Sequence, residues 1–166
     1  SEFQMVMMDG SAFIIAGYDV GFRSDVWKST DNGTTWSEVT AAAEFGDRRA
    51  FMAAAVSDRL VVAGGNNNDY ISDTWVSDDG GVSWTEQASP AWISRQGGQM
   101  VVVNGKLLLM GGVNSTRDFN DIWISENRGA TWREVTVNGS HWGNRYSFGA
   151  TVTHGGTIVV AGGRDR

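Results

Sequence analysis

The sequence repeats itself about every 48 residues, and this period limits the fold more than any other feature of the chain. Six of its eight tryptophans fall into two series with that spacing. The first series is Trp27, Trp75 and Trp123, and the second is Trp36, Trp84 and Trp132. Apolar runs that end in glycine follow the same period, at residues 13–17 (FIIAG), 60–65 (LVVAGG), 107–112 (LLLMGG) and 158–163 (IVVAGG).

A third series lies in the linkers between these units, where an aromatic residue is followed three positions later by an arginine. The pairs are Phe45 and Arg48, Trp92 and Arg95, and Trp142 and Arg145. Three interlocked series with one period indicate a tandem-repeat architecture, in which each repeat is a supersecondary unit that packs on its neighbours.

Within one period the local patterns predict strands, and no stretch has the apolar spacing of an amphipathic helix. In the second unit we expect four strands, named a to d in chain order, at residues 53–56, 60–63, 74–76 and 84–86. The a-to-b turns carry residues that accept the positive φ angles of tight hairpins, at Asp9-Gly10, Asn104-Gly105 and His154-Gly155-Gly156. Each complete repeat is therefore predicted to be a four-stranded antiparallel sheet.

Four short antiparallel strands per repeat are the content of one blade of a β-propeller, an all-β fold in which blades stack face to face around an axis. The expected blades are residues 4–46, 47–93 and 94–143, followed by a half blade of strands a and b at 144–166. Residues 1–3 precede the first repeat and are interpreted as a remnant of cloning. About three and a half blades do not close a ring, which typically has four to eight. We expect completion by homo-oligomerisation, with a dimer favoured, or by a longer parent chain.

The composition argues against several classes of protein. With 13 Lys and Arg against 19 Asp and Glu, the net charge is −6, which gives no general attraction for nucleic acid or anionic lipid. There is no cysteine for a disulfide, a thiolate nucleophile or a thiolate metal site. No apolar run approaches the roughly 20 residues of a membrane-spanning helix, and the N-terminus lacks the pattern of a secretory signal. We expect no nucleic-acid partner, no membrane association, no metal and no cofactor.

Three features of the units resemble kelch repeats, which form β-propellers. They are paired glycines after strand b, an arginine before strand a, and an aspartate-apolar-tryptophan sequence in strand c, at residues 25–27, 73–75 and 121–123. The first unit departs from this pattern, with Gly17-Tyr18 in place of the double glycine.

The c-to-d turn resembles a second motif, the Asp-box or BNR repeat of pattern SxDxGxTW, which also occurs in β-propellers. Its three copies contain Ser29, Asp31, Gly33 and Trp36; Ser77, Asp79, Gly81 and Trp84; and Ser125, Asn127, Gly129 and Trp132. The fourth unit has no such box. Asp-box proteins are often extracytoplasmic and kelch proteins often intracellular, so the compartment stays open, with the boxes favouring secretion.

We interpret the box as a structural turn. A carboxylate at the start of a hairpin accepts hydrogen bonds from backbone N–H groups two or three residues on, while glycine takes a positive φ angle and tryptophan packs under the turn. A calcium loop and a catalytic acid are the alternatives, but Ca²⁺ favours several carboxylates. Asn127 keeps the acceptor and loses the charge, which a structural turn tolerates better than a metal site does.

An enzymatic function finds little support in the residues. Asp-boxes occur in sialidases, whose sites use an arginine triad, but Arg48, Arg95 and Arg145 occupy equivalent repeat positions and match the kelch arginine instead. Kelch-like galactose oxidase uses a cysteine-modified ring, and this chain has no cysteine. His154 falls in an a-to-b turn, and His141 in a d-to-a loop is a candidate for binding. We expect a protein that is not an enzyme, with a sialidase-like glycoside hydrolase as the weaker alternative.

Binding is the function that the sequence favours. In propellers the d-to-a and b-to-c loops emerge on one face, and here they carry aromatic, arginine and asparagine residues, the mixture typical of recognition surfaces. The candidate ligand-binding residues are Tyr18, Arg23, Arg48, Tyr70, Trp92, Arg95, Phe119, His141, Trp142 and Arg145. For the aromatic-x-x-Arg series the alternative is packing between blades, with arginine bound to loop carbonyls.

The expected function is a non-catalytic module that binds protein or glycan through this face and assembles into a closed ring. The alternative is a structural fragment of a larger propeller whose function lies elsewhere.

Overall fold

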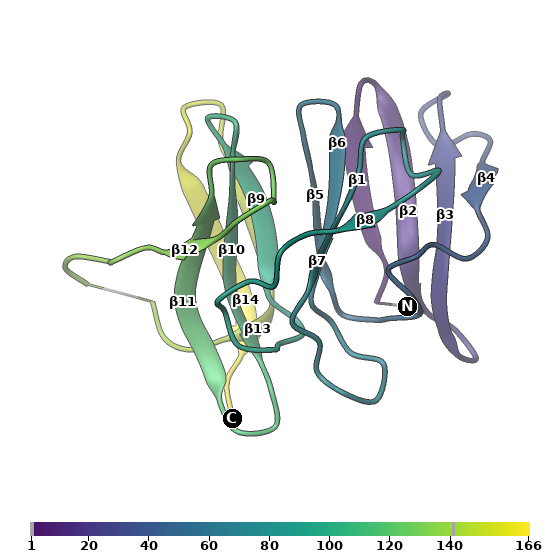
Figure 1. Cartoon of the computed structure of the whole chain (residues 1–166). Coiled ribbons are helices and arrows are strands. Elements are labelled where there is room, and N and C mark those ends of the chain that lie inside the picture. The colour runs from purple at the N-terminus through teal and green to yellow at the C-terminus, as the bar shows by residue number, and fades with distance from the viewer. Residues whose placement is uncertain (1, 141) are drawn as a thin grey trace.

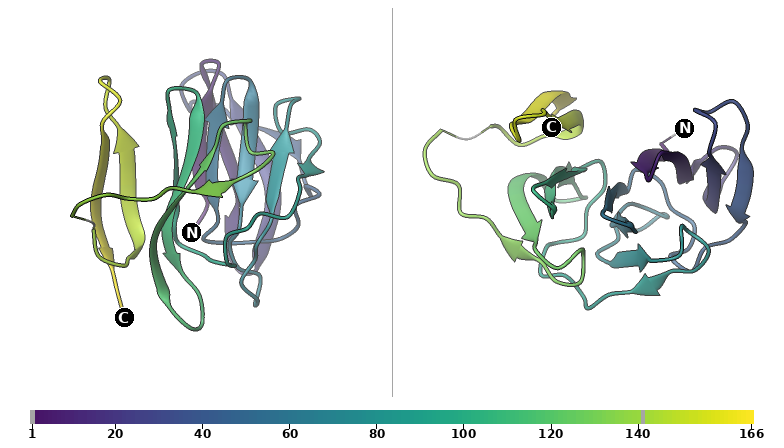
Figure 2. Two further views of the ribbon diagram at one scale, coloured as in Figure 1. Left: turned by 60° about the vertical axis from the view of Figure 1, so that its left-hand side comes forward. Right: turned by 90° about the horizontal axis from the view of Figure 1, so that it is seen from above.

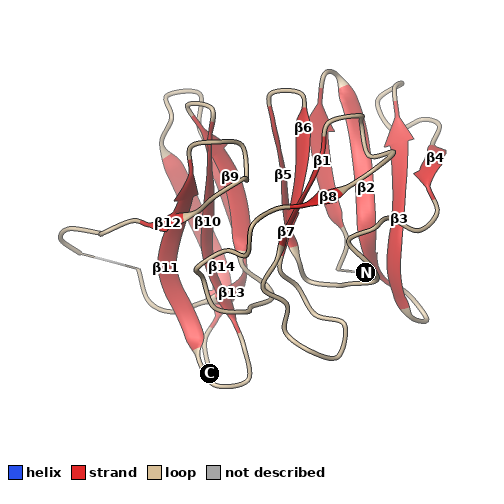
Figure 3. Cartoon of the chain, viewed as in Figure 1, coloured by secondary structure: helices blue, strands red, loops and turns tan. Residues whose placement is uncertain are grey.

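The computed structural model describes residues 2–140 and 142–166, and these residues form strands and loops without a helix (Figure 3). Three sheets have four antiparallel strands and the fourth has two. The strands are β1 (Gln4–Met8), β2 (Ser11–Tyr18), β3 (Phe22–Ser29) and β4 (Ser37–Thr40); β5 (Met52–Val56), β6 (Arg59–Ala63), β7 (Thr74–Ser77) and β8 (Thr85–Glu86); β9 (Gln99–Val103), β10 (Lys106–Val113), β11 (Asp118–Ser125) and β12 (Arg133–Glu134); and β13 (Tyr146–Val152) and β14 (Ile158–Arg164). The all-β prediction is confirmed.

The sheets stand side by side in an arc, in sequence order (Figures 1 and 2). Strands β1, β5, β9 and β13 come first in their sheets and contact one another in that order along the inner side of the arc. Radially placed four-stranded antiparallel sheets are the blades of a β-propeller, as the repeat predicts. The view from above in Figure 2 shows the two ends of the arc apart, so the ring is open.

The strands of the second unit lie within one residue of those expected from the repeat. The linkers between sheets belong to no strand, so the blade boundaries placed within them remain a prediction.

Two of the a-to-b turns have the backbone that their residues predict. Asp9 and Gly10 have φ angles of 49° and 71°, and Asn104 and Gly105 have 50° and 74°. Positive φ at both central residues gives a turn whose twist matches that of paired strands. The β13–β14 turn is longer, and of its three expected turn residues only Gly156 has a positive φ, at 79°.

Paired glycines follow the apolar part of strand b because the chain there passes very close to strand a. A Cβ atom on Gly65 would lie 2.8 Å from Cβ of Phe51, which leaves no room for a side chain. In the first sheet this place is taken by Ala16 and Gly17, with φ angles of 45° and 122°, and not by Gly17-Tyr18. The sequence alignment of the first unit is therefore one residue out of register, and Ala16 takes the first glycine position.

Apolar side chains fill the three interfaces between consecutive sheets. The first interface is centred on Phe13, Ile15, Val26, Leu60, Val62 and Trp84, the second on Val61, Val76, Leu107, Leu109 and Trp132, and the third on Val101, Met110 and Phe148. The second and third sheets are buried on both faces. Because apolar burial contributes roughly 25 cal/mol per Å², these interfaces are the main source of stability.

The first sheet has a neighbour on one face only. Its other face exposes Phe3, Met5 and Met7, at 49%, 62% and 58% of their surface. Phe3 is one of the residues interpreted as a remnant of cloning. It lies against Gly17 in the same way as its repeat equivalent, the buried Phe51, lies against Gly65. Phe3 therefore has a regular place in the fold, on a face without a neighbouring sheet.

Candidate functional site

Two buried arginines hold the loops at one edge of the arc. Arg48 donates from Nη1 and Nη2 to the carboxylate of Asp73, at 2.8 and 2.9 Å. It also donates to the carbonyl oxygens of Gly64, at 3.0 Å, and of Phe45. This one guanidinium group therefore ties the loop that leads into strand a to the b-to-c loop and to the start of strand c.

Arg95 repeats this arrangement in the third sheet. Its side chain is fully buried, and both terminal nitrogens donate to Asp121, one of them at 2.9 Å. Nη1 also donates to Gly111 O at 3.1 Å, and the guanidinium carbon lies 4.0 Å from the ring centroid of Phe119. Burial acts to raise the pKa of the Asp121 carboxyl, but the hydrogen bonds from Arg95 and Trp123 and the charges of Arg95 and Arg117 together lower it more, so this pKa lies below its ordinary value. The pair is ionised at neutral pH.

The tryptophan two residues after each aspartate completes the arrangement. Trp75 Nε1 donates to Asp73 at 2.8 Å, and Trp123 Nε1 donates to Asp121 at 2.9 Å. Each carboxylate is thus held from two sides, by an arginine and by an indole N–H. We refer to this set of residues as the Arg–Asp–Trp clamp.

The two ends of the arc contain incomplete clamps. In the first sheet, Trp27 Nε1 donates to Asp25 at 2.9 Å, but among residues 2–140 and 142–166 this carboxylate is in no ion pair. In the fourth sheet, Arg145 donates to the carbonyl oxygens of Gly162, at 3.0 Å, and Gly143, at 3.3 Å, and pairs with no carboxylate of the described residues.

The loops from three sheets gather on one edge, the lower edge in Figure 1, and those of the second and third sheets are held by the two complete clamps. Val20 in the β2–β3 loop is 89% exposed, and Ile93 in the loop before β9 is 47% exposed. Arg23 is exposed and lies 3.6 Å from Asp19. These loops offer aliphatic, basic and acidic groups on a base fixed by buried ion pairs.

The structure divides the candidate ligand-binding residues into two groups. Arg48, Trp92, Arg95 and Phe119 are buried. Arg23 is exposed, while Tyr18, Tyr70, Trp142 and Arg145 are half-buried, and His141 lies outside the described residues. The Trp142 ring packs edge-on against Phe148, 5.3 Å between centroids.

Sequence reasoning missed the aspartate partners of the arginines and the exposed aliphatic residues. Asp73 and Asp121 follow Arg48 and Arg95 by 25 and 26 residues, a recurring separation that signals the pair. Val20 has no recurring signal, because it belongs to a loop whose length and sequence differ between repeats.

The c-to-d turns lie on the opposite edge and share one hydrogen-bond pattern. Ser29 donates its hydroxyl to Asp31 at 2.8 Å and accepts from Gly33 N at 2.9 Å. Asp31 also accepts from the backbone N–H and the hydroxyl of Thr35, at 2.8 and 2.6 Å. These bonds lower the pKa of Asp31 to about 2, with Thr35 contributing most. The Asp31 carboxylate therefore binds the residue four positions later in the turn, Thr35, while the hydroxyl oxygen of Ser29 accepts from the N–H of Gly33.

The third turn keeps this pattern with an amide. Asn127 Oδ1 accepts from Thr131 N at 2.9 Å, and its Nδ2 donates to the Thr131 hydroxyl at 2.8 Å. The amide thus reverses one hydrogen bond and preserves the turn without a charge.

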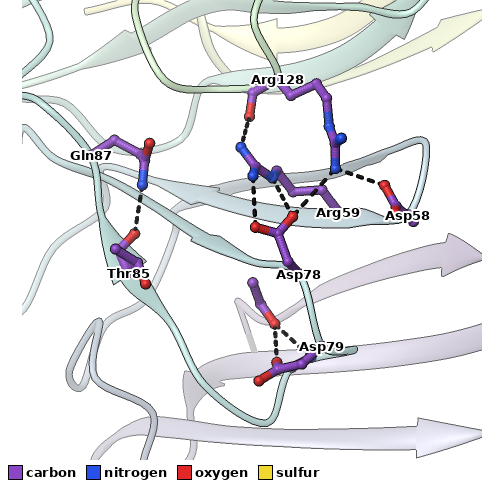
Figure 4. Close-up of polar contacts among 9 residues, drawn as sticks. Asp58, Arg59, Asp78, Asp79, Thr85, Gln87 and Arg128 are labelled. Atoms are coloured by element: carbon purple, nitrogen blue, oxygen red, sulfur yellow. Dashed lines mark hydrogen bonds and ion pairs between the residues drawn. The ribbon is translucent and has the colours of Figure 1, made fainter.

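Ion pairs connect this third turn to the second sheet (Figure 4). Arg59 donates two hydrogen bonds to Asp78, both at 2.6 Å, and Arg128 donates to Asp58 at 2.7 Å. Arg59 Nη1 also reaches Arg128 O at 3.3 Å. The hydrogen bond from Arg59 is the main cause that lowers the pKa of Asp78. Because the carboxylates of Asp58 and Asp78 are exposed to water, each pair contributes about 1 kcal/mol or less.

The described residues contain no group of three or more His, Asp or Glu side chains placed to hold a metal ion. Nor is there, in this part of the chain, a helix long and apolar enough to cross a membrane.

Blades of four antiparallel strands, two of them tied by an arginine before strand a and an aspartate at or near the start of strand c, define a repeat-built β-propeller. The model of the KLHDC2/KLHL20/DRC7 Kelch-repeats domain matches residues 2–166, and the chain therefore belongs to the Kelch-repeat family. A comparison with curated proteins gave no match. The kelch resemblance is confirmed, while the Asp-box resemblance stays a prediction.

The clamp makes a prediction about two equivalent arginines. Replacing Arg95 by methionine leaves the Asp121 carboxylate without its partner, and we expect a loss of about 3–5 kcal/mol in the free energy of unfolding. The same change at Arg145, which pairs with no carboxylate in the part of the chain that the structure describes, should cost about 1 kcal/mol or less. Urea unfolding of the two variants measures both values. Equal losses of unfolding free energy in the two variants would contradict the claim that the ion pair with Asp121 makes Arg95 the more stabilising residue.

Proposed function

We propose that this chain is a non-catalytic interaction module that binds a protein segment through the loop edge. The observation that carries the proposal is the gathering of exposed loop side chains from different blades on one edge, where buried Arg–Asp–Trp clamps hold the loops of the second and third sheets. A rigid base reduces the entropy that the loops lose when they bind a ligand. The candidate contacts on this edge include the exposed Arg23 and the half-buried Tyr18 and Tyr70.

The exposed groups favour a protein partner over a glycan. Val20 and Ile93 offer aliphatic surface, which binds apolar side chains, whereas Arg23 supplies directional hydrogen bonds. Carbohydrate binding is an alternative outcome of the experiment below.

Catalysis by a sialidase-like arginine site is disfavoured by the clamps. The guanidinium groups of Arg48 and Arg95 already bind aspartates and carbonyl oxygens, so they cannot hold a substrate carboxylate without breaking those bonds. We also propose that the c-to-d turns are Asp-box turns with a structural role, which the contacts of Asp31 and Asn127 support.

Two exposed valines on opposite edges test the loop-edge proposal. Peptides selected from a displayed library, and a panel of immobilised glycans, are titrated against the wild type, Val20→Asp and Val82→Asp. Val82, which is 58% exposed, lies in a c-to-d turn and serves as the matched control. We expect Val20→Asp to weaken peptide binding about tenfold or more, because a charge replaces apolar contact surface, and Val82→Asp to have no effect. Equal affinity of a ligand for the wild type and for both variants would contradict the proposal. Glycan binding that is lost only in Val20→Asp would assign the edge to carbohydrate.

The proposal includes completion of the ring, with a second copy of the chain as the favoured partner. The apolar face that carries Phe3, Met5 and Met7 supports it, since such patches normally mark interfaces. Light scattering should give a particle mass near twice the 18.0 kDa of one chain. A stable particle of 18.0 kDa at all concentrations would contradict self-assembly.

A further inference from the structure

We propose that the segment from Arg128 to Thr136 is a substrate of a serine/threonine kinase that selects arginine three residues before the acceptor hydroxyl. The acceptors are Thr131, in the third c-to-d turn, and Thr136, in the linker that follows β12. None of the residues assigned to the loop edge takes part, so the inference does not depend on the proposed function.

The transfer joins Oγ1 of Thr131 or of Thr136 to the γ-phosphorus of ATP. The bond from this phosphorus to the oxygen shared with the β-phosphate breaks, ADP leaves, and the hydroxyl proton passes to a base of the kinase. The chain itself supplies the hydroxyl and the side chains by which the kinase recognises it.

Two arginine–threonine pairs with this spacing lie close together in the segment. Residues 128–131 read RGAT and residues 133–136 read REVT. The equivalent of Arg128 is Asn32 in the first c-to-d turn and Gly80 in the second. Kinases commonly select their substrates by charge patterns of this kind. Of the three c-to-d turns, the third is therefore the one with the arginine that this class of kinase requires.

A glutamate three residues after the hydroxyl cannot provide this selection. It recurs in all three c-to-d turns, as Glu38, Glu86 and Glu134. A kinase directed by acidic residues finds the same signal in each turn, so this signal cannot account for a preference between them.

The first two c-to-d turns hold their hydroxyl groups against carboxylates. Thr35 and Ser83 stand at the position of Thr131, and all three residues are exposed. The Thr35 hydroxyl donates to Asp31 at 2.6 Å, and the Ser83 hydroxyl donates to Asp79 at 2.5 Å. A phosphate on either oxygen would replace this donor by negative oxygens beside a carboxylate, which repels them. These two positions are therefore unfavourable for phosphorylation.

The third turn has the opposite polarity at this hydroxyl. Asn127 Oδ1 accepts from the backbone N–H of Thr131 at 2.9 Å, so the amide nitrogen faces the hydroxyl and donates to it at 2.8 Å. The hydroxyl proton of Thr131 is not used in this bond. A phosphate oxygen on Thr131 can accept from the same amide, so the turn is compatible with the modification.

Thr136 is accessible for a different reason. Strand β12 has two residues, Arg133–Glu134, and beyond it Thr136 and Val137 are exposed, Val137 at 39%. A segment that has left the sheet can extend into the cleft of a kinase with fewer hydrogen bonds to break than a residue inside a strand.

Two guanidinium groups favour the phosphorylated form. Arg133 is 63% exposed and follows Thr131 by two residues, which in an extended segment places the two side chains on the same face. Its carboxylate neighbour, Glu126, is 3.5 Å away. Arg128 donates to Asp58 at 2.7 Å in an exposed ion pair (Figure 4), and such pairs are weak enough to be given up. A phosphate carries about −1.5 to −2 charges and competes with these carboxylates for the arginines.

The equivalent turns of the same chain are the controls for the experiment. The folded full chain is incubated with ATP and the catalytic domain of calcium/calmodulin-dependent protein kinase II, which selects arginine at this position. Tandem mass spectrometry locates the phosphate over time. We expect initial rates at Thr131 and Thr136 about tenfold or more above those at Thr35 and Ser83.

Substitutions assign each phosphate to its arginine. Arg128→Ala should lower the rate at Thr131 about tenfold or more and leave the rate at Thr136 unchanged. Arg133→Ala should lower the rate at Thr136 by a similar factor. Asn127→Asp should slow the reaction at Thr131 alone, because it gives the third turn the carboxylate of the other two.

A transplant tests the same residues in the first turn. Asp31→Asn combined with Asn32→Arg gives that turn the amide and the arginine of the third. Asn32 and Arg128 have φ angles of 58° and 59°, so the new arginine fits the backbone. We expect the rate at Thr35 to rise about tenfold or more, and Asp31→Asn alone to have little effect. Far-UV circular dichroism of each variant checks that it is folded.

Three results would overturn the proposal. They are the absence of phosphate at both Thr131 and Thr136 in the wild type, equal rates at Thr131 and at the equivalent hydroxyls of the other turns, and rates that do not fall in Arg128→Ala and Arg133→Ala. Phosphate at Thr136 with none at Thr131 would overturn the assignment of the turn, and would show that its hydrogen bonds keep Thr131 from the kinase.

Discussion

Each sheet of this chain has two apolar faces, and the structure depends on covering both of them with neighbouring sheets. The second and third sheets satisfy this requirement, and their buried tryptophans, Trp84 and Trp132, lie in the interfaces with the preceding sheet. Trp36 occupies the same position in the first sheet and is half-buried, because no sheet formed by residues 2–140 and 142–166 covers it. The same residue type in the same local structure thus has a different environment according to its place in the arc.

The Arg–Asp–Trp clamp connects this packing to the binding edge. Arg48 and Arg95 satisfy loop carbonyl oxygens that would otherwise be buried without partners, and they fix the b-to-c loops against the linker that enters strand a. The loops can then vary in sequence above a constant base.

Much of the fold follows from the repeat, because period, apolar runs and turn residues agree on four strands per unit. Asp9-Gly10 and Asn104-Gly105 specify their hairpins by local backbone preference alone. The alignment of Ala16 and Gly17 could not be read in this way, since it depends on how closely Gly17 approaches Phe3. Nor could the sequence predict the surroundings of each repeated residue. Arg95 and Arg145 match in sequence, but among the described residues only Arg95 has an aspartate in strand c of its own sheet. Of the binding residues, recurring positions were found readily and proved largely buried, whereas Val20, the most exposed of the loop residues described above, lies outside every repeated pattern.

Comparison of Trp84→Ala with Trp36→Ala tests most directly whether stacking of the blades holds the chain together. Unfolding by urea is measured in dilute solution, at a concentration where light scattering shows one chain per particle. We predict that Trp84→Ala lowers the free energy of unfolding by about 3–5 kcal/mol, since it opens a cavity in an inter-blade core. Trp36→Ala should lower it by about 1 kcal/mol or less, because this side chain has no adjoining sheet to pack against. Equal losses at the two positions would contradict the account.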